Sequence, residues 1–324
     1  MRITALCGGI GGARFLLGLR TIGHDVTAIA NTGDDLTVLG LRICPDLDSV
    51  LYTLGGGVSG ERGWGREGET FRVREELAEY AAAVTAAQPL VPSWFGLGDL
   101  DLATHLLRAS WLADGVSLST VTQWLSERWK TGIRLIPASD DRVETHVRLG
   151  DGAVVHFQEW WVRMRAAVPA IGFELHGADT AKPAPGVLDA IGSADVVLLA
   201  PSNPVVSIGT ILGVPGVAAA VRATPAPVVG LSPIIGGAPV RGMADACLAA
   251  IGVQTAADAV ARHYGARTEG GLIDGWLVDE VDAGVVAALR DEGFAARAVP
   301  LLMRDVEATS AMAAAALDLA GSIT

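Results

Sequence analysis

The chain has 324 residues, a length that corresponds to about two domains or to one large α/β domain with an insertion. Half of the residues are hydrophobic and 19% are charged, which supplies a large core and excludes a mostly disordered chain. The formal net charge of −12 excludes a broad basic face, so we expect no nucleic acid as a partner.

The cysteine and hydropathy patterns predict a cytoplasmic protein. Cys7, Cys44 and Cys247 form no C-x-x-C pair and cannot build a disulfide framework, which suits a reducing compartment. Glycines at 8–12 interrupt the apolar start of the chain before it reaches the ~7–15 apolar residues of a signal sequence. No stretch approaches the ~18 uncharged apolar residues of a spanning helix, so we expect no membrane partner.

The N-terminal segment predicts a strand, a glycine loop, a helix and a second strand. Residues 3–6 and 26–30 are apolar runs of strand length, and residues 13–19 have apolar side chains at helical spacing. Strand, helix and strand in this order imply a parallel pair that is joined by a right-handed crossover.

Residues 61–132 differ from the rest of the chain, because tryptophans and charges are interleaved there. We expect helices over 72–84, 104–112 and 117–129. We interpret this segment as a helical insertion.

The remaining chain predicts a doubly wound sheet. Apolar runs at 196–200 and 228–231 are each followed by a polar turn, and an Ala-rich helix is expected over 309–319. Such runs are typical of parallel strands that are buried on both faces. The predicted fold class is therefore α/β: a Rossmann-like, doubly wound, mostly parallel sheet, with residues 1–60 and 133–324 as its nucleotide-binding core.

A glycine-rich loop directly follows the first predicted strand. Gly9, Gly11 and Gly12, with Arg14 beside them, are candidate phosphate contacts, because glycines let backbone N–H groups approach and the next helix adds a favourable dipole. The alternative is a tight turn between strand and helix. Arg14 replaces the third glycine of the dinucleotide fingerprint, and Asn31 stands where an acid would hold an NAD ribose. An NAD-dependent oxidoreductase is therefore disfavoured, as is a Walker-type NTPase, which needs Gly-Lys-Ser/Thr.

Four carboxylates lie close in sequence to this loop. Asp34 and Asp35 follow the second strand, and Asp46 and Asp48 follow Pro45. In an extended stretch Asp46 and Asp48 would share one face. Carboxylates and phosphate oxygens are the usual ligands of Mg²⁺, so Asp35, Asp46 and Asp48 are candidate metal ligands. The alternatives are a solvated charge cluster and a helix cap at Asp48.

The two polar turns after the later strands are candidate nucleotide contacts. Ser202 and Asn203 suit a base or ribose edge, and the turn that contains Ser232 and Gly236 suits a phosphate. The alternative is plain turn chemistry.

An aromatic loop within the insertion suits a planar ligand. Phe95 and Gly96 lead through Asp99 into a predicted helix. The alternative is an aromatic anchor that packs the insertion onto the core. Residues 158–161 resemble a buried strand edge, to which no chemistry is assigned.

Several segments, in this order along the chain, together carry a resemblance. They are residues 8–14, 31–35, 45–49, 97–99, 103–105, 156–161, 201–204 and 232–236. In these segments the chain resembles the CofD/FbiA transferases of deazaflavin coenzyme F-420 biosynthesis over nearly its whole length. The actinobacterial branch looks closest at residues 8–17, 241–245 and 263–267.

The resemblance implies a reaction. The family moves a three-carbon phosphate unit from a guanosine diphosphate-linked donor to the ribityl hydroxyl of the deazaflavin Fo and releases GMP. An enolpyruvyl donor, thought typical of the actinobacterial branch, gives dehydro-F-420-0, and a 2-phospholactyl donor, described in the archaeal branch, gives F-420-0. The resemblance also implies Mg²⁺, a Rossmann-like core and a homodimer.

The resemblance also implies roles for residues. Residues 61–132 would help to seat the deazaflavin, with Asp48, Phe95, Gly96 and Asp99 on the Fo side. Asp46 and Asp48 would hold Mg²⁺ or orient the attacking hydroxyl, and which of them is ligand and which is base stays open.

A non-enzymatic regulator of the same fold that binds a nucleotide sugar is the alternative. The helical insertion and residues 45–48 favour the transferase.

Overall fold

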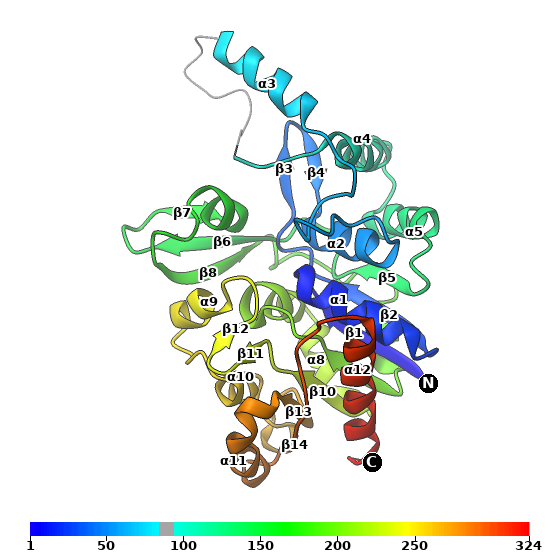
Figure 1. Cartoon of the computed structure of the whole chain (residues 1–324), viewed down its shortest axis with the longest axis vertical. Coiled ribbons are helices and arrows are strands. Elements are labelled where there is room, and N and C mark those ends of the chain that lie inside the picture. The colour runs from blue at the N-terminus through cyan, green and yellow to red at the C-terminus, as the bar shows by residue number, and fades with distance from the viewer. Residues whose placement is uncertain (84–93, 324) are drawn as a thin grey trace.

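The computed structural model describes residues 1–83 and 94–323, and a parallel sheet lies at its centre. Seven strands follow the order β14-β13-β10-β9-β1-β2-β5, and each neighbouring pair is parallel. They are β1 (Arg2–Cys7), β2 (Asp25–Ala30), β5 (Arg134–Pro137), β9 (Val196–Leu199), β10 (Val228–Leu231), β13 (Gly275–Val278) and β14 (Ala295–Ala298). The chain builds from β1 outward through β2 to β5 and then returns to β9 on the other side of β1 (Figure 1). The predicted Rossmann-like fold is therefore confirmed, with its switch point between β1 and β9.

Helices cover both faces of the sheet, which explains why its strands are apolar without alternation. In β1, Ile3 and Ala5 pack into the core on one face, and Leu6 packs into the core on the other. The first face carries α1 (Gly9–Thr21), α2 (Pro45–Leu54), α5 (Leu118–Trp129) and α12 (Val306–Gly321). The second carries α6 (Val187–Gly192), α7 (Gly209–Gly213), α8 (Val217–Ala223), α10 (Ala257–Tyr264) and α11 (Val286–Asp291).

The chain leaves the sheet between α2 and α5. α3 (Arg72–Ala83) projects from the body in Figure 1 and has no buried residue, and α4 (Asp99–Ala113) lies nearer the core. α5 packs against β5, and its residues Val121 and Leu125 belong to the main core. Of the three helices expected in the insertion, α5 is therefore part of the layer on the sheet. Val84, the last residue of the helix expected over 72–84, lies outside the described residues.

Smaller elements frame the carboxyl end of the sheet. An antiparallel sheet of β7 (Val154–His156), β6 (Glu144–Leu149) and β8 (Ala170–His176) stands beside α9 (Ala244–Ala250). Two hairpins pair β3 (Leu36–Val38) with β4 (Leu41–Ile43) and β11 (Ile234–Ile235) with β12 (Ala238–Pro239). Short helical turns are η1 (Glu159–Arg163), η2 (Pro204–Ile208), η3 (Arg267–Glu269) and η4 (Glu280–Val285).

The expectation of a strand edge over 158–161 is wrong. Residues Glu159–Arg163 form a π-helical turn, η1. Trp160 is buried there, and its indole N–H donates to the carbonyl of Val168 at 2.7 Å. The helical turn lets Trp160 pack inward while its neighbour Trp161 faces a cavity.

Within residues 1–83 and 94–323, no single helix has the length and apolar character needed to cross a membrane. Among the helices of those described residues, only the pair Pro204–Gly213 and Val217–Ala223 meets that test together, and this pair is bent by 88°.

Candidate functional site

A cavity of about 690 Å³ opens at the carboxyl ends of β1, β9 and β10, beside the switch point of the sheet. Most of the site residues that the sequence predicts line it. They are Gly9, Gly11, Arg14, Asp46, Asp48, Phe95, Gly96, Ser202, Asn203 and Ser232. Gly12, Asp35, Asp99 and Gly236 do not line it.

The N-terminus of α1 faces this cavity. The helix starts at Gly9, inside the glycine run, so the predicted loop is largely the first turn of the helix. Gly8 caps the helix in an extended conformation without a side-chain hydrogen bond, and the first turn contains no acidic residue. The cavity therefore meets the positive end of a 13-residue helix, an arrangement that favours a phosphate group.

Gly12 serves packing rather than the cavity. A Cβ atom at this position would lie 2.7 Å from Ser202 Oγ and 2.9 Å from Cys7 Cβ. Close approach of α1 to β1 and to the turn after β9 therefore requires this glycine. The prediction that Gly12 contacts a phosphate is not supported by its position.

Two buried carboxylates share one amide at the end of β2. Asn31 Nδ2 donates to Asp34 Oδ1 at 3.0 Å and to Asp46 Oδ2 at 2.9 Å. Gln158 also donates to Asp34, and the backbone N–H of Gly9 donates to Asp46. Burial, together with the charge of Asp46, holds the pKa of Asp34 well above its usual range, and burial raises the pKa of Asp46 to about 6.

Asp34 and Asp46 fit a cation better than the predicted ligands Asp35, Asp46 and Asp48 do. No three His, Cys, Asp or Glu side chains in the described part of the chain are grouped as a metal cage. Asp34 and Asp46 nevertheless supply two carboxylates that have no cationic partner in residues 1–83 and 94–323, and both line the cavity. Mg²⁺ is commonly held by one or two carboxylates while substrate phosphates complete its shell.

The structure differs from the sequence prediction for Asp35 and Asp48. Asp35 points away from the cavity, where it pairs with Arg42 at 3.0 Å and accepts from the Cys44 thiol at 3.1 Å. Asp48 lines the cavity but pairs with buried Arg108. Asp46 and Asp48 lie in the first turn of α2 rather than in an extended stretch, so two residues of separation place them about 200° apart around the helix.

The turn residues use their polar atoms on the backbone. Ser202 Oγ accepts from Gly8 N at 3.0 Å and donates to Gly8 O at 2.8 Å, and Asn203 caps η2. Ser232 closes its own turn through Ile234, and the N–H of Gly236 donates to Asp282 outside the cavity. These contacts are turn chemistry, although Ser202, Asn203 and Ser232 still form part of the cavity wall.

Aromatic side chains form part of the cavity wall. Phe95 and Gly96 lie there as expected, together with Trp64, Tyr52 and Trp161, which the sequence analysis missed. The placement of Trp64 between Gly63 and Gly65 was an available signal, because a tryptophan flanked by glycines in a loop is typical of a binding surface.

Asp99 is a cap rather than a ligand contact. Thr70 Oγ1 donates to its carboxylate, and the backbone N–H of Val73 in the first turn of α3 donates to it at 3.2 Å. The carboxylate therefore holds the start of α3 against the start of α4.

Guanidinium groups complete the cavity. Arg14, Arg241 and Arg304 line it, and Arg241 donates to the carbonyl of Arg62 at 2.9 Å. Neither Arg14 nor Arg304 pairs with an acid of the described chain. The cavity thus joins a positive helix end and free guanidinium groups to a carboxylate pair and an aromatic wall, which suits an anionic donor and a planar acceptor.

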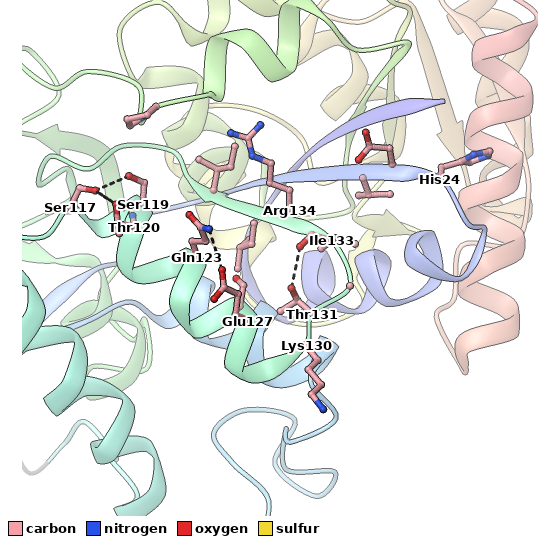
Figure 2. A pocket seen from close by; sticks show the side chains of 17 residues that line it. His24, Ser117, Ser119, Thr120, Gln123, Glu127, Lys130, Thr131, Ile133 and Arg134 are labelled. Carbon is pink, nitrogen blue, oxygen red and sulfur yellow. Dashed lines mark hydrogen bonds between the residues drawn. The ribbon is translucent and has the colours of Figure 1, made fainter.

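A second hollow, of about 800 Å³, lies between α5 and the edge strand β5 (Figure 2). Ser117 contacts Ser119 and Thr120 in the cap of α5, and Gln123 donates to Glu127. Most of these polar groups therefore satisfy each other, and the hollow lies away from the carboxyl ends of β1 and β9. We assign the site to the first cavity.

Comparison with known proteins agrees with this geometry. The family model "2-phospho-L-lactate transferase CofD" matches residues 3–313. Proteins named phosphoenolpyruvate transferase are similar: that of Streptomyces griseus is 58% identical over 328 residues (100% of this chain, 99% of that protein), and that of Kitasatospora aureofaciens is 60% identical over 329 residues (100% and 99%). The protein of that name from Mycolicibacterium smegmatis is 54% identical over 337 residues (99% of each).

The solved structure of a Bacillus halodurans protein of the UPF0052 family is similar in fold. Its TM-score is 0.61 at 21% identity, covering 97% of this chain and 99% of that one, so it supports the architecture alone. The family match, the relatives and the cavity at the switch point lead to one conclusion: the chain belongs to the CofD family of transferases.

Proposed function

We propose that the chain transfers an enolpyruvyl-phosphate unit from a guanosine diphosphate-linked donor to the ribityl hydroxyl of the deazaflavin Fo, giving dehydro-F-420-0 and GMP. The single observation that carries this proposal is the cavity at the switch point, which is lined by the start of α1, by the Asp34–Asp46 pair and by aromatic side chains. The actinobacterial relatives named phosphoenolpyruvate transferase support enolpyruvyl as the three-carbon group.

The donor diphosphate would lie against the start of α1. Backbone N–H groups at Ile10 and Gly11 are directed to the cavity at the positive end of the helix. Arg14, one turn along α1, would neutralise one phosphate oxygen. Such transfer depends mainly on positioning and charge neutralisation, which these groups provide.

Asp34 and Asp46 would hold Mg²⁺. When bound, the ion neutralises charge on the phosphates and screens the two carboxylates from each other. Asn31 holds both carboxylates toward the cavity through one amide, and Gln158 fixes the outer oxygen of Asp34.

The acceptor would lie against the aromatic wall. Trp64 and Phe95, which line the cavity, would contact a planar deazaflavin, and Gly96 leaves room beside Trp64, whose ring would lie 3.5 Å from a Cβ at that position. Asp48, on the floor between the two sides, would accept the hydrogen bond of the attacking hydroxyl and aim its oxygen at the phosphorus.

The test is product mass. Purified chain is incubated with Fo, Mg²⁺ and a donor made in place from GTP by the guanylyltransferase with either phosphoenolpyruvate or 2-phospholactate. We expect efficient formation of the enolpyruvyl product, which is lighter than the lactyl product by two hydrogen atoms. Turnover with 2-phospholactate alone would contradict the donor assignment, and no change in deazaflavin emission on mixing would favour a regulator that binds no Fo.

A further inference from the structure

A buried chain of polar side chains runs from α2 to α4 beneath the cavity. Asp101, His105 and Arg108 lie one turn apart on the same face of α4, toward α2. The side chains of His105 and Arg108 are each 1% exposed. Buried polar groups are costly unless they are hydrogen-bonded, so the contacts that these side chains make with each other are informative.

Arg108 holds both oxygens of Asp48. Its Nη1 donates to Asp48 Oδ2 at 3.0 Å, and its Nη2 donates to Asp48 Oδ1. A bidentate pair fixes the rotation of a carboxylate as well as its position. Asp48 and His105 line the cavity and Arg108 does not, so Arg108 can act on a substrate only through these side chains, and Asp48 is the one that it holds with two hydrogen bonds.

His105 fixes Arg108 in turn, and its tautomer follows from the contact. Arg108 Nη1 lies 3.1 Å from His105 Nδ1. A guanidinium has no acceptor and keeps its proton, so Nδ1 must offer its lone pair and the ring proton sits on Nε2. Nε2 lies 3.2 Å from Asp101 Oδ1, to which Tyr52 also donates at 2.5 Å. Arg108 is therefore the guanidinium that holds Asp48 directly.

Resting on the proposed transfer to a hydroxyl acceptor, we infer that Arg108 is a positioning residue for the acceptor half of the reaction. Arg108 fixes the orientation of the Asp48 carboxylate, so that one of its oxygens orients the attacking hydroxyl. His105 in turn fixes the position of the Arg108 guanidinium. The donor half is separate, because Asn31, Asp34 and Asp46 make their contacts without Arg108.

A double-mutant cycle tests this inference. Arg108→Gln and Asp48→Asn are made singly and together, and kcat and KM for Fo are measured beside the affinity for GDP. A misplaced catalytic group costs roughly 100-fold, so we expect each single variant to lose about that factor in kcat. The double variant should match Asp48→Asn within about twofold, since coupled residues are not additive. Affinity for GDP should stay within about twofold in all three.

Two further variants separate positioning from folding. Arg108→Lys keeps the charge without the planar fork, so it should recover part of kcat but not all of it. Arg267→Gln breaks another ion pair, with Asp274 at 2.8 Å, far from the cavity, and should leave kcat unchanged. The double variant removes both members of the Asp48–Arg108 pair, so its comparison with Asp48→Asn is informative even if Arg108→Gln alone does not fold.

The outcomes are distinct. A further tenfold loss on adding Arg108→Gln to Asp48→Asn, or full activity of Arg108→Gln, overturns the inference. Weakened GDP binding in the folded Arg108→Gln variant overturns the claim that Arg108 acts only on the acceptor half of the reaction. A wild-type chain that neither binds nor modifies Fo overturns the proposed function, and this inference with it.

Discussion

Asn31 shows how one amide can organise a charged site. It stands at the carboxyl end of β2, where a dinucleotide-binding enzyme would place an acid for the ribose. Its Nδ2 serves Asp34, Asp46 and the carbonyl of Val206, and its Oδ1 accepts from Gly33 N. Every polar atom of this buried side chain is used, so it fixes both carboxylates without adding a third negative charge.

Asp46→Asn should stabilise the unliganded protein. Burial raises the folded-state pKa of Asp46 to about 6 from 3.8. A carboxylate with a raised pKa stabilises the fold below pH ~4, and this contribution is lost as pH rises through ~6. Asn does not ionise. The difference in melting temperature between the variant and wild type should therefore increase from pH 4 to pH 6 and stay constant above pH 6. The gain at pH 7 should be about 1–3 kcal/mol, with transferase activity lost.

Mg²⁺ provides the control for this prediction. With GDP present, the ion should raise the melting temperature of wild type and should raise that of Asp46→Asn much less, because one of its two proposed carboxylates is missing. A variant that melts below wild type at pH 7, with an unchanged Mg²⁺ response, would show that Asp46 is a structural residue.

At the scale of elements, the start of α1 predicts an electrostatic conflict between stability and binding. Ile10 lines the cavity in the first turn, which holds no acid. Ile10→Asp should stabilise the helix by roughly 0.3–1 kcal/mol through the dipole. The same charge should repel a diphosphate and raise the Kd for GDP at least tenfold, or ~1.4 kcal/mol. Isothermal titration measures the affinity, and neutral Ile10→Asn should bind far better than Ile10→Asp. Equal affinities of the two variants would place the diphosphate elsewhere.

The segment that carries Trp64 is held by one buried carboxylate. Glu69, with a fully buried side chain, accepts from Asp101 N at 2.7 Å and from Arg66 N at 3.1 Å, and lies 3.6 Å from Arg62. These contacts tie the segment to the start of α4.

Gly98→Ala should release that segment. A Cβ atom at residue 98 would lie 1.7 Å from the carboxyl carbon of Glu69, so the carboxylate must leave its place. We expect Fo affinity, measured by deazaflavin fluorescence, to fall about tenfold or more, ~1.4 kcal/mol, and GDP affinity to stay unchanged. Gly60→Ala on the same segment is the matched control, because nothing lies within 4 Å of its Cβ. Equal Fo affinity of Gly98→Ala and wild type would remove the segment from the acceptor site.

Elements differ in how well the sequence predicts them, for physical reasons. β1, β2, β9 and β10 are continuous apolar runs because both faces of the sheet are covered, so their pattern is unambiguous. The turn at 158–161 was mispredicted because two adjacent tryptophans carry no period, and tertiary packing of Trp160 decides the conformation.

The candidate site is predictable in outline for the same reason. The glycine run and the later turns each follow a strand, and the carboxyl ends of parallel strands lie at the same edge of the sheet. The order of strands and turns in the sequence is therefore enough to predict that these segments lie together. The choice of Asp34 over Asp35 depends on which side chain points inward from a turn, and the pairing of Asp48 with Arg108 joins residues 60 positions apart. Neither is encoded in local spacing.

At the scale of the whole molecule, the proposed function places the two substrates against different parts of the chain. The sheet and its turns supply the proposed donor side of the cavity, whereas the segments between α2 and α5 supply Trp64, Phe95 and the α4 face. α2 supplies a residue to each, Asp46 to the proposed donor side and Asp48 to the proposed acceptor side. A ligand for one side should therefore leave most of the other side unchanged.

Hydrogen exchange measured by mass spectrometry tests this division. The first-turn amides of α1, at Ile10 and Gly11, have no helical partner and should exchange quickly in the free protein. GDP with Mg²⁺ should slow exchange at 8–14 and 201–207, and Fo alone should slow it at 62–70 and 95–105. Each ligand at 100 times its Kd should add about 2.7 kcal/mol to the free energy of unfolding. Amides of the stable core, which exchange through global unfolding, should therefore exchange more slowly by the same factor with either ligand. This uniform change serves as the internal reference. Protection by GDP confined to 62–70, or by Fo confined to 8–14, would reverse the assignment of the two sides.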